Sequence, residues 1–132
     1  MRQKFNNSKK SIKDFGEVFT PDSLVNEMLD KLPPECFTDN KSFLDNSCGN
    51  GQFLCAVLER KIENGFSHLE SLKEIYGVEL CPDNVVECKT RLTKNSIDPE
   101  IDRVLKSNII NADALDPTHI GWSDVGFYWG ED

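Results

Sequence analysis

The sequence predicts an α/β protein in which the three strands of one parallel sheet alternate with helices. Short apolar segments at 41–45, 75–79 and 108–112 each end at an acid or directly before one, which is typical of buried strands that stop at a polar edge. Between them, residues 52–63 and 82–94 carry apolar side chains at helical spacing. A βαβαβ order with short connections predicts parallel strands and half of a doubly wound sheet.

One further helix is expected before the sheet. It is predicted to begin at Thr20-Pro21-Asp22, where threonine can cap, proline suits the first helical position and aspartate complements the helix dipole. It should run to about Leu32, where Pro33-Pro34 stops it. One apolar stripe marks its buried face: Leu24, Val25, Met28, Leu29 and Leu32. Residues 35–41 are then expected to form a loop.

The turn after the first strand is the most informative stretch. It reads Asp45-Asn46-Ser47-Cys48-Gly49-Asn50-Gly51. Asp45 can accept hydrogen bonds at the end of the strand, and the two glycines allow a close backbone approach and positive φ. Phe53 and Leu54 stand where a dinucleotide-binding turn would have its third glycine, which disfavours a pyrophosphate ligand. The turn therefore predicts either a site for a nucleoside-bearing cofactor or a purely structural connection.

Two later strands also end in acids. Glu79 follows the glycine turn by roughly 30 residues, so it should lie beside the first strand, where a carboxylate can accept both hydroxyls of a ribose. The alternative for Glu79 is a solvated acid at a strand end. Asp113 ends the third strand, and its alternative role is to cap the next turn.

Four segments in order resemble motifs of a known family. They are Phe15 to Pro21, Ser42 to Leu54, Ile75 to Leu80, and Asn108 to Leu115. The first resembles the Gly-x-x-Phe-Thr-Pro segment that precedes motif I, and the others resemble motifs I, II and III, of the S-adenosylmethionine-dependent N6-adenine DNA methyltransferases. In particular, the Phe15 to Pro21 segment resembles the one found in Type I modification subunits and fused restriction-modification enzymes.

The resemblance implies the cofactor-binding, N-terminal half of a Rossmann-like methyltransferase fold, with S-adenosylmethionine as cofactor. The turn at 19–21 would close over the methionine end, Glu79 would hold the ribose, and Asp113 would face the adenine. The implied cofactor-binding residues are Phe19, Thr20, Pro21, Asp45, Ser47, Cys48, Gly49, Gly51, Glu79, Leu80, Asp113 and Ala114. The family's catalytic motif IV, Asn/Asp-Pro-Pro-Tyr/Phe, does not occur in the sequence, so no catalytic residue is predicted.

Composition and charge limit the partners. The 132 residues fit one domain, with a basic flexible arm at 1–14 and a truncated S-adenosylmethionine-binding domain at 15–132. Residues 1–13 carry five of the 15 basic side chains and none of the 23 acids. The acidic remainder repels phosphates, so DNA is expected to be reached only through the arm or a partner.

Metal binding and membrane insertion are not expected. The five cysteines form no Cys-x-x-Cys pair, and no ligand spacing links them to His68 or His119. No apolar run approaches the length of a membrane span. No apolar segment follows the basic arm, so the arm does not resemble a secretory signal, and a cytoplasmic location is expected.

Two functions remain open. The chain is either the cofactor-binding portion of an N6-adenine DNA methyltransferase, inactive alone, or a catalytically inactive methyltransferase-like protein that acts by binding proteins, as a decoy or inhibitor of restriction-modification. The strand at 41–45 is expected to be an unpaired apolar edge. A homodimer, a complementing methyltransferase subunit or the aromatic tail at 122–129 could cover it.

Overall fold

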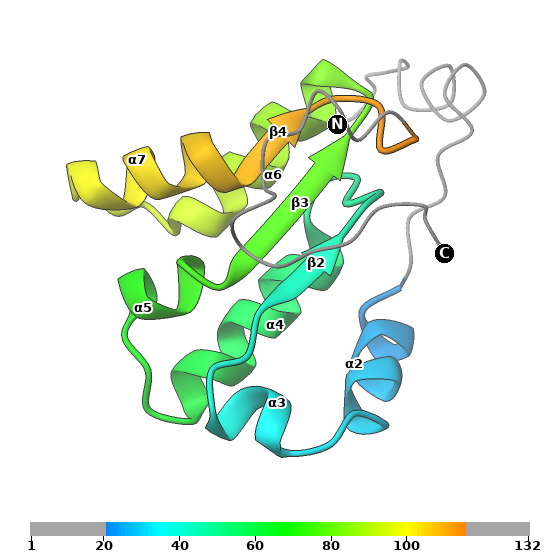
Figure 1. The fold of residues 1–132 in the computed structure, drawn as a ribbon, viewed down its shortest axis with the longest axis vertical. Coiled ribbons are helices and arrows are strands. Elements are labelled where there is room, and N and C mark those ends of the chain that lie inside the picture. Colours follow the sequence, from blue (N-terminus) through cyan, green and yellow to red (C-terminus); the bar gives the residue numbers. More distant parts are fainter. Residues whose placement is uncertain (1–20, 116–132) are drawn as a thin grey trace.

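The computed structural model describes residues 21–115 (Figure 1). Its elements, in chain order, are α2 (Asp22–Asp30), α3 (Glu35–Thr38), β2 (Phe43–Asp45), α4 (Gln52–Glu63), α5 (His68–Leu72), β3 (Ile75–Glu79), α6 (Pro82–Thr93), α7 (Pro99–Asn108) and β4 (Ile109–Asn111). Among the helices of residues 21–115, none combines the length and the apolar composition of a membrane span.

The three strands form one parallel sheet in the order β2-β3-β4. Phe43 pairs with Ile75 on one side of β3, and Gly77 pairs with Ile109 on the other. All five residues of the central strand are buried, as expected for a parallel strand. The predicted α/β class and the βαβαβ order are confirmed, and β2 is an edge of the described sheet.

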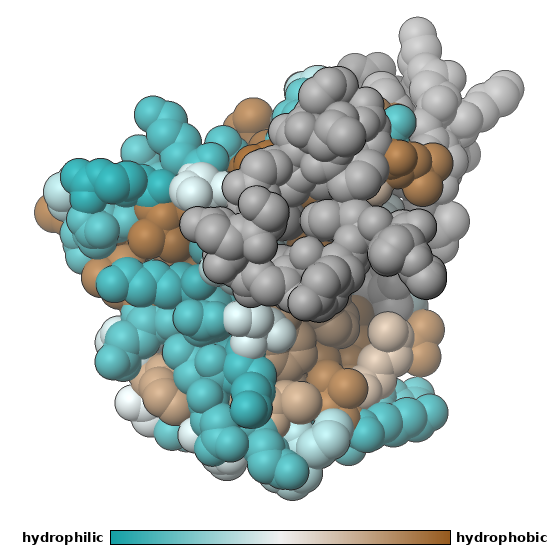
Figure 2. Space-filling model, viewed as in Figure 1, coloured by the Kyte–Doolittle hydropathy of each residue, from teal (hydrophilic) through white to brown (hydrophobic). Residues whose placement is uncertain are grey.

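One core joins the helices to a single face of the sheet. Phe43, Ile75 and Ile109 supply this face, and every described helix contributes at least one buried side chain to the same cluster. Figure 1 shows α4 and α6 on this side of the strands. A smaller cluster lies on the opposite face, around Tyr76 and Val78, and no described helix contributes to it. In Figure 2 the outer surface over α5 and α7 is largely hydrophilic.

The helix before the sheet is shorter than predicted. Pro21 has φ −61° and ψ 150° and is the N-cap of α2, not its first helical residue. The helix ends at Asp30, because Pro33 disfavours helical geometry at the residue before it. Of the predicted stripe, Val25 and Leu29 are buried, whereas Leu24 and Met28 are 45% and 47% exposed. Thr20 lies outside the described residues.

The prediction of a loop over 35–41 is wrong in part, since α3 occupies Glu35–Thr38. This single turn is too short to show helical periodicity in the sequence. Its buried residue is Phe37, whose ring stacks on Phe43 with centroids 5.2 Å apart. Tertiary packing against the first strand therefore decides this element.

The helices α4 and α6 lie close to their predicted bounds. Gly65 has φ 102° and directly follows the C-cap of α4, where its N–H donates to Ile62 O while Phe66 N–H donates to Lys61 O, a Schellman motif. Asp98 caps α7 by accepting a hydrogen bond from Glu100 N–H at 2.9 Å.

Three details differ from the prediction. The helix α7 extends to Asn108, which was expected to begin the third strand, because its side chain is buried and donates to Leu72 O of α5. The strands β2 and β4 have three residues each. Val86, one of the apolar side chains within 82–94, is 63% exposed, because α6 buries a narrower row that includes Val85 and Leu92.

A buried lysine fixes the entry to β2. Lys61 of α4 is 0% exposed, and its Nζ donates to Asn40 Oδ1 and to Lys41 O, each at 2.6 Å. The same Nζ lies 5.0 Å from the centroid of the Phe43 ring, within cation–π range. Burial lowers the pKa of Lys61 to about 8 from 10.5.

Candidate functional site

The carboxyl ends of the three strands meet at one edge of the sheet. Asp45 pairs with Gly77, and Glu79 pairs with Asn111. The sheet therefore brings Asp45, Glu79 and the segment after Asn111 together, as predicted from their positions at strand ends. In open α/β sheets this edge is where ligands bind.

Asp45 lies half-buried at the start of the glycine loop. Its Oδ1 accepts a hydrogen bond from Ser47 N–H at 3.1 Å, which closes a local turn. Burial raises the pKa of Asp45 above its usual value, the Ser47 N–H opposes this rise, and the charge of Glu79 adds to it. The charge of Glu79 therefore reaches the Asp45 carboxyl group across this edge.

The glycine loop has the backbone conformation expected of it. Gly49 has φ 53° and Gly51 has φ 90°, in the region that side chains disfavour. Gly51 is also packed so closely on α6 that an added Cβ would lie 2.8 Å from Cys88 Sγ and 3.2 Å from Cys88 Cα. As N-cap of α4 it offers no side-chain acceptor, so the first N–H groups of the helix have no side-chain cap.

The loop also packs directly on the central strand. Cys48 is 5% exposed, and its N–H donates to Val78 O at 2.9 Å. A Cβ on Gly77 would lie 2.9 Å from both Cys48 Sγ and Leu54 Cδ1. Sequence reasoning missed the role of Gly77, although a glycine inside a buried strand is itself a signal of close backbone approach.

Glu79 ties two loops together. It is 6% exposed, its Oε1 accepts from Gly49 N–H at 2.8 Å and its Oε2 accepts from Cys81 N–H at 3.0 Å. A carboxylate has about four lone-pair sites, so each oxygen keeps further acceptor capacity. The acid expected to hold a ribose therefore also fixes the glycine loop.

The residues after β3 and β4 differ widely in exposure. Leu80 is 58% exposed. Asp113 is exposed as well, and its Oδ1 accepts a hydrogen bond from Leu115 N–H at 2.9 Å. Asp113 thus caps the turn that follows it, which is the alternative to a role in cofactor binding. Ala114 packs on the cluster of Tyr76 and Val78.

Asn111 was not predicted as a site residue. Its Nδ2 donates to Glu79 O at 2.9 Å and to Leu80 O at 2.8 Å. These two bonds join the end of β4 to the loop that follows β3. An asparagine at the end of a strand gave no signal that distinguished it from an ordinary polar residue.

The start of α2 lies beside this edge. Gln52, the first residue of α4, donates from Nε2 to Asp22 Oδ1 at 2.6 Å. The exposed Pro21 directly precedes Asp22, so Pro21 lies near the first residue of α4. Phe19 and Thr20 lie outside the described residues.

The helix α6 packs against the glycine loop and forms hydrogen bonds with it. Arg91 Nη1 donates to Asn50 O at 3.2 Å, and Asn50 Nδ2 lies 3.5 Å from Glu87 Oε2. The Cys48 thiol contacts the Cys88 thiol, and this hydrogen bond, together with burial, raises the pKa of Cys48. Cys48 is thus a packing group of the loop at neutral pH.

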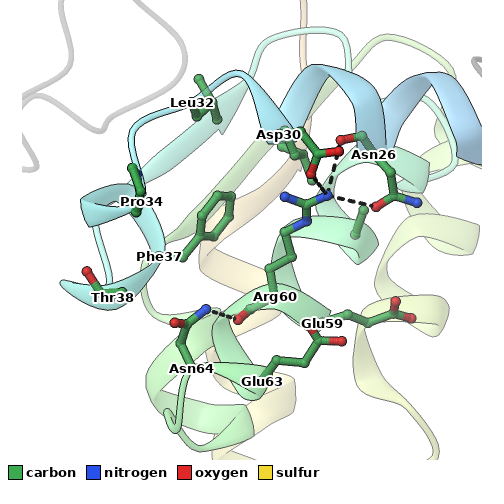
Figure 3. A pocket seen from close by; sticks show the side chains of 12 residues that line it. Asn26, Asp30, Leu32, Pro34, Phe37, Thr38, Glu59, Arg60, Glu63 and Asn64 are labelled. Atoms are coloured by element: carbon green, nitrogen blue, oxygen red, sulfur yellow. Dashed lines mark hydrogen bonds and ion pairs between the residues drawn. The ribbon is translucent and has the colours of Figure 1, made fainter.

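A pocket of about 440 Å³ lies elsewhere, between α2, α3 and α4 (Figure 3). Arg60 crosses it, with Nη2 2.7 Å from Asp30 Oδ1 and its guanidinium carbon 5.7 Å from the Phe37 centroid. Arg60 and Asp30 lie near the C-terminal ends of their helices, whereas the glycine loop lies at the start of α4. The pocket is therefore separate from the carboxyl edge.

Within residues 21–115, no group of three or more His, Cys, Asp or Glu side chains is placed to hold a metal ion. The chemistry available at the edge is that of carboxylates, backbone N–H groups and one exposed leucine. Such a set can bind a ligand with hydroxyl and cationic groups next to an apolar ring.

Comparison with known proteins gives one assignment. A family model described as N-6 DNA Methylase matches residues 3–123. No curated protein and no solved structure gives a significant match. The family match spans the glycine loop and all three strand ends, and the order of these elements agrees with the predicted motifs. The chain belongs to the N-6 DNA methylase family.

Proposed function

We propose that this chain is the S-adenosylmethionine-binding portion of an N6-adenine DNA methyltransferase of a restriction-modification system. The observation that carries the proposal is the hydrogen bond from Gly49 N–H to Glu79 Oε1. It joins the glycine loop to the acid of the second strand in a single arrangement. A nucleoside ligand would then meet a loop and a ribose acceptor that are already ordered, which reduces the entropy cost of binding.

The cofactor's charges suit this edge. S-adenosylmethionine carries a positive sulfonium and a positive ammonium, and the carboxylates of Asp45 and Glu79 lie at this edge, where the charge of Glu79 contributes to the raised pKa of Asp45. In the proposal, Asp45, with Ser47, Cys48, Gly49 and Gly51 of the loop, borders the methionine part.

The nucleoside part would lie beyond the loop. Glu79 would accept the ribose hydroxyls. Leu80 and Ala114 would border the adenine. Asp113 would accept a hydrogen bond from the amino group of the adenine. The Phe19-Thr20-Pro21 turn would close over the methionine end, a role supported by the position of Pro21 next to Asp22 and Gln52.

We further propose that the catalytic groups come from another segment or polypeptide. The sequence contains no Asn/Asp-Pro-Pro-Tyr/Phe motif, and the resemblance assigns to that motif the groups that hold the target adenine after it is flipped from the duplex. DNA would be reached through that partner or through the basic arm at 1–14, while residues 15–132 form the binding domain. The proposed location is the cytoplasm.

The edge that β2 forms in the sheet of residues 21–115 supports a partner. Phe43 N–H donates to Glu74 O on the side of β3, so in the described sheet the N–H and C=O of Leu44 point to the opposite side. A strand from a second copy or from a complementing subunit could pair there. Covering an exposed edge in this way removes a site for aggregation.

Calorimetry with S-adenosylmethionine tests the cofactor proposal. We expect the purified chain to bind the cofactor and to transfer no labelled methyl group to adenine in DNA. Methyl transfer by the 132-residue chain would contradict the claim that the catalytic groups lie elsewhere.

The second candidate is a catalytically inactive, methyltransferase-like protein that binds other proteins as a decoy or inhibitor of restriction-modification. The strongly acidic composition outside the arm favours it. Absence of S-adenosylmethionine binding, together with inhibition of a purified restriction-modification enzyme by the chain, would support this candidate over the first.

A further inference from the structure

The loop after β3 presents one apolar side chain at the carboxyl edge. Leu80 is 58% exposed although it lies between two buried residues, Glu79 and Cys81. Both neighbours are held by hydrogen bonds, because Cys81 N–H donates to Glu79 Oε2 at 3.0 Å. Leu80 is thus an exposed side chain on a short, ordered connection.

Asn111 holds the backbone at this position. One Nδ2 donates to two successive carbonyl groups, Glu79 O at 2.9 Å and Leu80 O at 2.8 Å. Ala112 N–H donates to the same Glu79 carbonyl at 3.1 Å. The bond to Leu80 O fixes the peptide group that follows Leu80, and this limits the directions that the Leu80 side chain can take.

The chemistry of the contact is specific to a carboxamide. Its NH₂ group supplies two donors from one atom. An aspartate at this position would supply no donor when ionised and would place negative charge against two carbonyl oxygens. An alanine would leave both carbonyls without this partner.

We propose that Asn111 is a positioning residue, whose carboxamide holds Leu80 in place as an apolar wall for the adenine ring of the cofactor. The inference rests on the proposed function, since it requires S-adenosylmethionine at this edge. A wall that is fixed before binding contributes more affinity than one that must be ordered by the ligand. Asn111 itself need not touch the cofactor.

A double-mutant cycle with S-adenosylmethionine tests the positioning role. Asn111→Ala should weaken binding roughly ten-fold, as expected for the loss of hydrogen bonds that order a contact. Leu80→Ala should weaken it by a similar factor. In the double variant the two losses should not multiply, because Asn111 acts through Leu80. Losses that multiply fully would overturn the positioning role.

Two further variants complete the design. Asn111→Asp should bind at least as weakly as Asn111→Ala. Thr90→Ala is the matched control, because it also removes one side-chain bond to a backbone carbonyl, from Thr90 Oγ1 to Val86 O on α6, and it should leave the affinity unchanged.

Amide hydrogen exchange measured by NMR gives a readout that needs no ligand. In Asn111→Ala, the Leu80 and Cys81 amides should exchange faster than in the parent chain, while amides in α7 keep their rates. Unchanged exchange would show that Asn111 does not hold the loop. If the parent chain binds no S-adenosylmethionine, the proposed function and the wall both fail, and exchange alone decides whether Asn111 fixes the loop.

Discussion

Replacing Glu79 by alanine should both destabilise the fold and abolish most cofactor affinity. The change leaves the N–H groups of Gly49 and Cys81 without the acceptors that lie 2.8 and 3.0 Å away. An unsatisfied buried donor costs about 1–3 kcal/mol. Because Gly49 is only half-buried, water can replace part of its bond, and we expect a total loss of about 2–4 kcal/mol.

Urea unfolding followed by circular dichroism measures this loss. Since the free energy of unfolding of small domains is about 5–15 kcal/mol, the variant should remain folded. Glu27→Ala, which removes an exposed glutamate on α2, is the control and should change the free energy by less than about 0.5 kcal/mol. An equal, small effect in both variants would refute the assignment of Glu79 as the group that joins the two loops.

Calorimetry on the folded Glu79→Ala variant tests the predicted loss of cofactor affinity. Loss of the ribose acceptor should weaken S-adenosylmethionine binding by about 2–4 kcal/mol, more than either Asp45→Ala or Asp113→Ala. Glu79→Gln keeps the shape but sets an amide N–H against one backbone donor, so it should resemble the alanine variant. Unchanged affinity in a folded variant would remove Glu79 from the binding site.

Four other predictions follow from the same structure. The free energy of unfolding should rise between about pH 8 and pH 10.5, because folded Lys61 loses its proton at a pKa of about 8 and the unfolded chain only near 10.5; the rise, measured by urea titration, should be absent in Lys61→Met. Gly77→Ala should destabilise the fold by about 1–3 kcal/mol in the same assay, because its Cβ would lie 2.9 Å from two buried side chains. Since burial raises the pKa of Asp45 above 3.8, cofactor affinity should begin to fall at a higher pH than for an ordinary aspartate, and calorimetry should show no such fall in Asp45→Asn. Light scattering at micromolar concentration should show a dimer, or a monomer that depends on residues 122–132; a monomer that persists after their deletion would contradict the account of the open β2 edge.

The sequence by itself determined the order of the elements and the edge of the sheet at which the candidate residues lie. Strands that end in Asp45 and Glu79, a turn with Gly49 and Gly51, and helices at 52–63 and 82–94 all follow from local periodicity and turn residues. These signals are local, because each depends on residues within one or two turns of one another. The motif order added the family, which the match over residues 3–123 confirmed.

Other features were decided only by the tertiary structure. The turn α3 forms because Phe37 stacks on Phe43, and Lys61 is buried because the chain before β2 supplies two oxygens for its ammonium group. Neither partner can be recognised from the residues that surround these side chains in the sequence.

The same holds at the candidate site. Glu79 uses its carboxylate to bind Gly49, 30 residues earlier, and Asn111 binds carbonyl groups on the neighbouring strand's loop. Such contacts depend on how two crossovers place separate strand ends next to one another. A strand-end acid or amide looks alike in the sequence whether it meets solvent, a ligand or another loop, and only the packing of distant segments decides among these.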